Sequence, residues 1–176
     1  MRKVCVIAVL ILVAAVFAPA QDKVQVFGGY QFMNIDVDGV TNGFLTDRHT
    51  LHGWDADVTF RATKHFSVVS EISGNYGTIF GEDVKVHQFL FGPRVSFRND
   101  KTVVPFVQGL FGATHGSIGG SGETHFGTAF GGGVDVNVSK HVAVRLAKFD
   151  YNWVRYHERS LNNFRFASGI VFRFGE

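Results

Sequence analysis

Apolar and polar residues alternate with a period of two along most of the chain. The clearest run has Trp54, Ala56, Val58 and Phe60 alternating with Asp55, Asp57, Thr59 and Arg61. Because successive side chains of a β-strand point to opposite faces, this pattern predicts a strand with one apolar and one polar face. Comparable runs predict eight strands, at residues 23–37, 51–61, 65–76, 84–98, 103–114, 125–138, 142–156 and 163–174.

The length and number of these strands indicate a closed barrel. Most are ten or more residues long, which is long for a soluble strand and suits a tilted membrane crossing. A strand in hydrocarbon cannot leave its backbone amides unpaired, so a sheet there must close on itself. The predicted fold class is all-β, an eight-stranded antiparallel up-and-down transmembrane β-barrel. A soluble sandwich with a dry aromatic core is the alternative that periodicity leaves open.

The seventh predicted strand fits simple alternation least well. Val142, Val144 and Leu146 share one parity, whereas Phe149, Tyr151 and Trp153 share the other. A β-bulge near Ala147 and Lys148 would reconcile the two halves. Inward-pointing positions would then be Arg145 before the bulge and Lys148, Asp150 and Asn152 after it.

The connections between predicted strands alternate in length. Short connections fall at residues 62–64, 99–101 and 139–140, and longer ones at 38–50, 77–83, 115–124 and 157–162. Short inner turns and longer outer loops are typical of membrane barrels. Both chain ends are therefore expected on the short-turn side.

The N-terminal segment has the pattern of an export signal. Arg2 and Lys3 precede an apolar run from Val4 to Phe17, which ends in small residues before a cleavage site predicted between Ala20 and Gln21. The run is too short to cross a bilayer as a helix. We expect residues 1–20 to be a signal peptide for the Sec pathway and residues 21–176 to form the barrel domain. Cys5, the one cysteine, lies within the leader.

Charge argues against nucleic acid as a partner. Removal of the leader takes Arg2 and Lys3 from the 17 basic residues and leaves them equal in number to the 15 acidic ones. Nucleic-acid binding draws chiefly on phosphate neutralisation, and a neutral chain without a basic stripe lacks that attraction.

Charged residues on the polar parity of the strands are expected inside the barrel. An eight-stranded barrel is narrow and its interior is filled by side chains. Buried charges must pair across the strands. We therefore predict an internal ionic network made of Asp55, Asp57, Glu71, Arg94, Arg98, Asp135, Arg145, Arg165 and Arg173.

Aromatic residues near the long-loop ends predict an interfacial girdle. Tyrosine and tryptophan concentrate at the two membrane–water interfaces of barrels. The girdle is predicted to consist of Tyr30, Trp54, Tyr76, Tyr151, Trp153 and Tyr156.

Four stretches carry a resemblance to a known family. They are Val26 to Tyr30, Phe91 to Arg94, Pro105 to Gly109, and Gly169 to Phe174. With them, the chain resembles the OmpA-like and OmpX-like outer-membrane β-barrel proteins over about its whole mature length. The resemblance implies residence in the outer membrane. It also implies that Gly169, Ile170, Phe172 and Phe174 form the signal by which the barrel-assembly machinery recognises the last strand.

No motif predicts a cofactor or metal. The glycine-rich stretches at 116–122 and 131–133 lack a P-loop lysine. Five histidines fall on the long-loop side, at His49, His52, His115, His125 and His157, but without metal-binding spacing. We expect no bound metal, no cofactor and no catalytic residues.

The sequence thus predicts a non-enzymatic barrel of structural or surface-interaction type. Two alternatives stay open: a small low-conductance channel, and a lipid A-modifying deacylase or acyltransferase. The second would need Ser117 or Ser121 to approach His52 or His125. Expected partners are outer-membrane lipid, lipopolysaccharide and the assembly machinery, with an unknown surface partner and a monomeric state.

Overall fold

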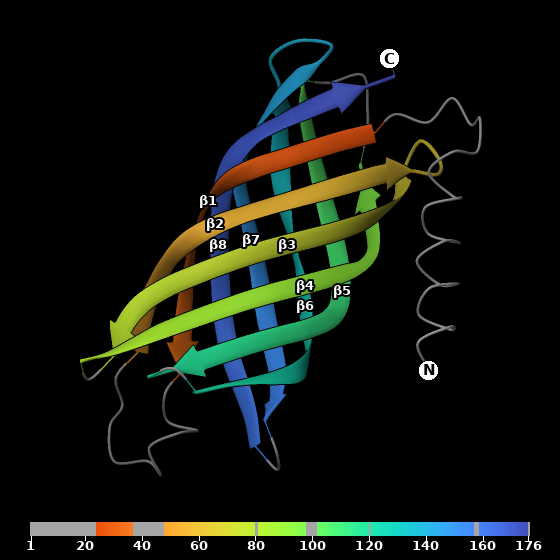
Figure 1. Ribbon diagram of the computed structural model, residues 1–176. Helices are drawn as coiled ribbons and strands as arrows, with labels where there is room; N and C mark the ends of the chain where they lie inside the picture. Colours follow the sequence, from red (N-terminus) through yellow and green to blue (C-terminus); the bar gives the residue numbers. More distant parts are fainter. Residues whose placement is uncertain are drawn as a thin grey trace.

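The chain forms one closed antiparallel barrel in the computed structural model, which describes residues 24–36, 48–79, 81–97, 102–119, 121–156 and 159–175. Each strand pairs with its neighbours in sequence, and the last pairs with the first (Figure 1). The strands are β1 (Val24–Asp36), β2 (Arg48–Arg61), β3 (Phe66–Ile79), β4 (Glu82–Ser96), β5 (Val103–Ile118), β6 (Ser121–Asn137), β7 (Val142–Tyr156) and β8 (Arg159–Phe174). The predicted fold class is confirmed. Among the described residues, none belongs to a helix that could cross a membrane.

The barrel closes through β1 and β8. Val24 lies opposite Phe174, and the pairing continues to Asn34 opposite Phe164. Gly29 faces Gly169 in this seam, and a Cβ on Gly169 would collide with the carbonyl oxygen of Gly28. The close backbone approach therefore explains a glycine at position 169. Residues 1–23, which include the predicted signal peptide and cleavage site, lie outside the described residues.

Large apolar side chains cover the outer surface of the barrel. Phe89, Phe130 and Phe172 are 54%, 59% and 48% exposed. On β4 the alternate residues point inward and are buried, and next to the other two phenylalanines Ala129 and Val171 are fully buried. This is the reverse of a soluble protein, in which such aromatics would pack in the centre, so it excludes the sandwich alternative and fits an exterior that faces lipid.

The predicted bulge in β7 is confirmed. Pairing between β7 and β8 shifts register between Arg145 and Lys148. Both side chains are fully buried, as are Asp150 and Asn152 beyond them to within 2%. One extra residue on β7, with Leu146 and Ala147 opposite the single residue Ser168, lets the strand point a charged side chain inward on each side of the shift.

The expectation of long outer loops is wrong at three of the four positions. β3 ends at Ile79 and β4 begins at Glu82; β5 ends at Ile118 and β6 begins at Ser121; β7 ends at Tyr156 and β8 begins at Arg159. The strands continue through the segments predicted to be loops. Backbone groups in these segments pair between β3 and β4, between β5 and β6, and between β7 and β8. Gly81 and Gly119 adopt positive φ angles of 84° and 57° beside the strand ends. Only the connection after Asp36 spans a longer gap.

Candidate functional site: the barrel interior

The interior holds two linked clusters of buried charges. The first, which we call the lower cluster, lies nearer the short turns and centres on Asp57 of β2. Its Oδ2 accepts from Arg94 Nη2 at 2.9 Å and from Arg145 Nη1 at 2.7 Å. Arg145 also donates through Nε to Asp135 Oδ1 at 2.8 Å. The four residues come from β2, β4, β6 and β7, so the cluster reaches from one wall to the opposite one.

The second, which we call the upper cluster, lies farther from the short turns and centres on Lys148 of β7. Its ammonium pairs with Asp55 and lies 2.7 Å from Glu71 Oε2 and 3.6 Å from Asp150 Oδ2. Arg165 of β8 forms an ion pair with Glu71, with Nη2 2.7 Å from Oε1, and donates to Asp150 Oδ2 at 2.9 Å. Three carboxylates thus share two cations, and each of these five side chains is at most 1% exposed.

Neutral amides join the clusters and fill the remaining space. Gln108 accepts from Arg94 Nε at 3.0 Å and donates to Asp150 Oδ1 at 3.0 Å, which links the lower cluster to the upper one. Gln88 accepts from Arg165 Nη1 at 2.9 Å and from Asn152 Nδ2 at 3.1 Å. Buried polar groups satisfied in this way are far less costly than unpaired ones.

Two inward-pointing phenylalanines pack against the guanidinium groups. The Arg145 Cζ lies 4.3 Å from the ring centroid of Phe27 and 4.7 Å from that of Phe106. Arg94 Cζ lies 4.5 Å from the Phe106 centroid. The aromatic faces stabilise the cations from the side that the carboxylates do not reach.

An apolar cluster lies inside the barrel near the end opposite the chain termini. Met33, Leu51, Ile79, Val84 and Val86 form one buried cluster from the walls β1 to β4.

Most residues predicted for the ionic network take part in these clusters. Asp55, Asp57, Glu71, Arg94, Asp135, Arg145 and Arg165 lie within contact of one another as described above. Arg173 is also buried, at 4% exposure, but it lies near the end of β8 beside the first residues of β1. Arg98 lies outside the described residues.

The predicted girdle residues point outward where their side chains are described. Tyr30, Trp54, Tyr76 and Tyr151 are exposed, and Trp153 is half-buried. The side chain of Tyr156 lies outside the described part. Their depth in a bilayer stays a prediction. Of the predicted assembly signal, Ile170, Phe172 and Phe174 are exposed on the outer surface, and Gly169 lies in the closing seam.

The described outer histidines are spread over three strands, with His49 and His52 on β2, His115 on β5 and His125 on β6. His52 Nδ1 lies 2.7 Å from the Tyr30 hydroxyl, and His125 Nε2 lies 3.2 Å from Glu123 Oε2. No group of three or more potential metal ligands occurs within the ranges that the structure describes. His157 is not among the described residues.

Solved outer-membrane barrels share this fold. Neisserial surface protein A matches with a TM-score of 0.69 and 14% identity, over 88% of this chain and 98% of that one. The attachment invasion locus protein Ail of Yersinia pestis matches with a TM-score of 0.62 and 15% identity, over 88% and 100%. The N-terminal barrel domain of Pseudomonas aeruginosa OprF matches with a TM-score of 0.60 and 9% identity, over 88% and 98%. At these identities the likeness shows the fold.

Sequence comparison identifies the family. No curated protein sequence gives a significant match. The family model described as outer membrane protein beta-barrel domain matches residues 5–174, which is nearly the whole chain. The chain therefore belongs to the outer membrane protein beta-barrel domain family, and the outer membrane is where it resides.

Proposed function

We propose that this outer-membrane barrel is a non-enzymatic protein of structural or surface-interaction type, with an interior closed to solutes. The observation that carries the proposal is the contact of Arg145 on β7 with Asp57 on β2 at 2.7 Å, which crosses the interior, while Arg145 also pairs with Asp135 on the neighbouring strand β6 at 2.8 Å. An open pore would need an aqueous path past this point. An eight-stranded barrel has an interior just wide enough for side chains, so paired side chains there fill the cross-section.

The energetics of the clusters also favour a closed interior. Separating a buried ion pair exposes each charge to a medium of low polarity, which costs several kcal/mol per ion. Gln108 links the two clusters, so a path along the barrel axis would have to disrupt both of them. Spontaneous opening is therefore expected to be rare and brief.

The outer ends of the strands support contact with molecules outside the cell. On β4 the outward side chains change from Phe91 and Phe89 to His87, Lys85 and Asp83. On β5 they change from Phe111 to His115. Paired strands that continue beyond an apolar surface form a rigid polar rim. One similar structure is a surface protein and another an attachment invasion locus protein, but these names belong to those proteins.

The arrangement of serines and histidines supports the absence of lipid A chemistry. His52 lies on β2 and contacts the Tyr30 hydroxyl, whereas Ser117 lies on β5, three strands away. His125 is opposite Thr114 rather than Ser117, and it contacts Glu123. A serine hydrolase needs its nucleophile within hydrogen-bond reach of the base. Unchanged lipid A mass spectra on overexpression are expected; loss of an acyl chain would contradict this part of the proposal.

Planar-bilayer recording tests the closed interior. We expect the native protein to give at most small, brief conductance steps. The triple variant Asp57→Ala, Arg94→Ala, Arg145→Ala removes three members of the lower cluster and should open a steady conductance. Lys64→Ala, at an exposed turn between β2 and β3, should behave as native. A large steady conductance of the native protein would overturn the proposal.

A further inference from the structure

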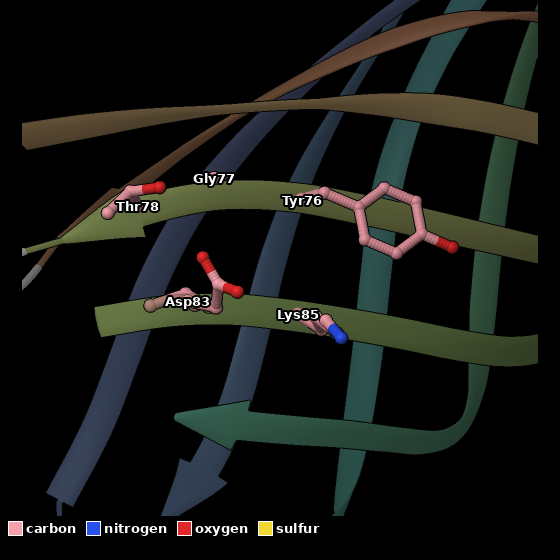
Figure 2. Close-up of a pocket in the computed structure, with 6 residues that line it drawn as sticks. Tyr76, Gly77, Thr78, Asp83 and Lys85 are labelled. Atoms are coloured by element: carbon pink, nitrogen blue, oxygen red, sulfur yellow. The ribbon is translucent and has the colours of Figure 1, made fainter. Parts of the chain in front are cut away.

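A hollow on the outer surface of the barrel lies between the ends of β3 and β4. Its volume is about 320 Å³ and it is lined by Tyr76, Gly77, Thr78, Asp83, Val84 and Lys85. Figure 2 shows the Tyr76 ring, the Thr78 hydroxyl, the Asp83 carboxylate and the Lys85 amine on the adjoining strands. Its volume falls at the lower end of the range for small-molecule sites.

Strand register places these groups opposite one another. Tyr76 pairs with Lys85, and Thr78 pairs with Asp83. Asp83 and Lys85 are two residues apart on the same face of β4, a separation of about 7 Å along the strand. In the part of the chain that the structure describes, neither side chain forms an ion pair. A cation and an acceptor are thus both available to a bound molecule.

The Tyr76 ring is held by its neighbours. Its hydroxyl lies 3.1 Å from His87 Nε2, and the two rings meet edge to face with centroids 5.5 Å apart. The Tyr76 hydroxyl also lies close to Gly74 and to the indole of Trp54. A Cβ on Gly74 would be 2.9 Å from the hydroxyl and 2.9 Å from the indole nitrogen. The ring therefore has a fixed orientation beside the hollow.

The hollow lies at the boundary of the apolar exterior. Along β4 the outward residue Phe89 is 54% exposed, and the next outward residues towards the hollow are His87 and Lys85. This end of the barrel is opposite the paired chain ends Val24 and Phe174, and the longest gap between strands, after Asp36, is at the same end. In outer-membrane barrels the end with the longer loop faces outside the cell. This topology predicts that the hollow lies at the level of lipid headgroups in the outer leaflet.

The geometry points to a binding site for the phosphorylated sugar headgroup of outer-leaflet lipopolysaccharide. Lys85 binds the phosphate through charge-assisted hydrogen bonds. The apolar face of the Tyr76 ring packs against the sugar, and the Asp83 carboxylate accepts hydrogen bonds from sugar hydroxyl or amide groups. Phe89 and Ile72, exposed on the same strands, contact the acyl chains. An Asp beside a Lys suits a sugar phosphate better than a plain anionic lipid, because the carboxylate has donors to bind.

Titration calorimetry in mixed micelles tests this site with the full folded chain. The probes are diphosphoryl lipid A, phosphatidylglycerol and inorganic phosphate. Lys85→Gln should weaken lipid A binding about tenfold, the effect of losing one hydrogen bond to a charged group. Asp83→Asn should also weaken it, whereas Lys64→Gln, an exposed lysine at the opposite end, should leave it unchanged. All variants alter exposed side chains, and heat-modifiable gel migration verifies that each is folded.

The other probes separate a sugar-phosphate site from general attraction. Phosphatidylglycerol and inorganic phosphate should bind weakly, with no difference between Lys85→Gln and Lys64→Gln. The inference is overturned if both lysine variants bind lipid A equally well. It is also overturned if phosphatidylglycerol binds as tightly as lipid A and loses as much on Lys85→Gln, because the hollow would then attract any anionic lipid.

Discussion

The guanidinium of Arg145 donates to the Asp57 carboxylate at 2.7 Å across the interior of the barrel, although the two residues are 88 positions apart in the chain. One residue belongs to β7 and the other to β2, strands that do not pair. The contact can form only when the barrel has closed. Folding and internal charge pairing are therefore coupled in this protein.

Asp57→Asn is expected to destabilise the barrel strongly. Asp57 accepts from both Arg94 and Arg145, so the substitution leaves two buried guanidinium groups short of a counter-charge. Breaking a buried pair in this way costs about 3–5 kcal/mol. Urea unfolding in detergent micelles measures the loss. The exposed Glu82→Gln serves as the matched control, and equal stability of the two variants would show that the buried pair contributes nothing.

A double-mutant cycle should reveal coupling between Lys148 and Glu71. Their charged atoms lie 2.7 Å apart and both side chains are buried. Residues in direct contact within one network typically show coupling energies of about 0.5–3 kcal/mol. The cycle compares Lys148→Met, Glu71→Gln and the double variant by equilibrium unfolding. Strictly additive losses would contradict the contact.

Gly74→Ala should displace the Trp54 indole. A Cβ at position 74 would lie 2.9 Å from Trp54 Nε1 and 2.9 Å from the Tyr76 hydroxyl, so both rings must shift. Overpacking of this kind costs about 1–3 kcal/mol. In a Trp153→Phe background the emission of Trp54 reports the shift. Gly28→Ala is the control, because a Cβ there meets nothing within 4 Å; an unchanged Trp54 spectrum in Gly74→Ala would contradict the packing.

Phe174→Ala tests the proposal that the last strand is read during assembly. Phe174 is 56% exposed on the outer surface, so its loss should cost little in the folded barrel. We propose that the variant refolds in detergent as the native chain does but accumulates poorly in the outer membrane. Surface-matched Phe164→Ala is the comparison. Equal amounts of folded protein in the membrane would argue against a role for Phe174 in assembly.

Strand number, the inward parity and the β7 bulge could be predicted because period-two alternation is strong within the apolar band. The outer strand ends could not, because beyond that band both faces are polar. At His115 and Thr124, for example, polarity no longer separates the two faces, yet backbone pairing continues. Pairing of backbone groups does not depend on side-chain polarity, so the strand signal fades before the strand does.

The charged interior residues were found from their sign and parity, but other interior residues carry no such signal. Gln108 and Gln88 connect the clusters, although a neutral amide on the inward parity resembles any polar residue. Phe27 and Phe106 point inward among charges, against the rule that aromatics face lipid, because guanidinium groups pack on their rings. Only the three-dimensional arrangement identifies these contacts.

Spin-label accessibility tests most directly whether lipid surrounds the apolar face of this barrel while its charges pair inside. Single cysteines at Phe89, Phe130 and Phe172, in a chain without Cys5, take nitroxide labels for measurement in lipid vesicles. At all three positions we expect frequent collision with oxygen, which concentrates in hydrocarbon, and little collision with a water-soluble nickel chelate. Labels that collide with neither reagent would lie in a packed centre, and this result would contradict a lipid-facing position for these phenylalanines.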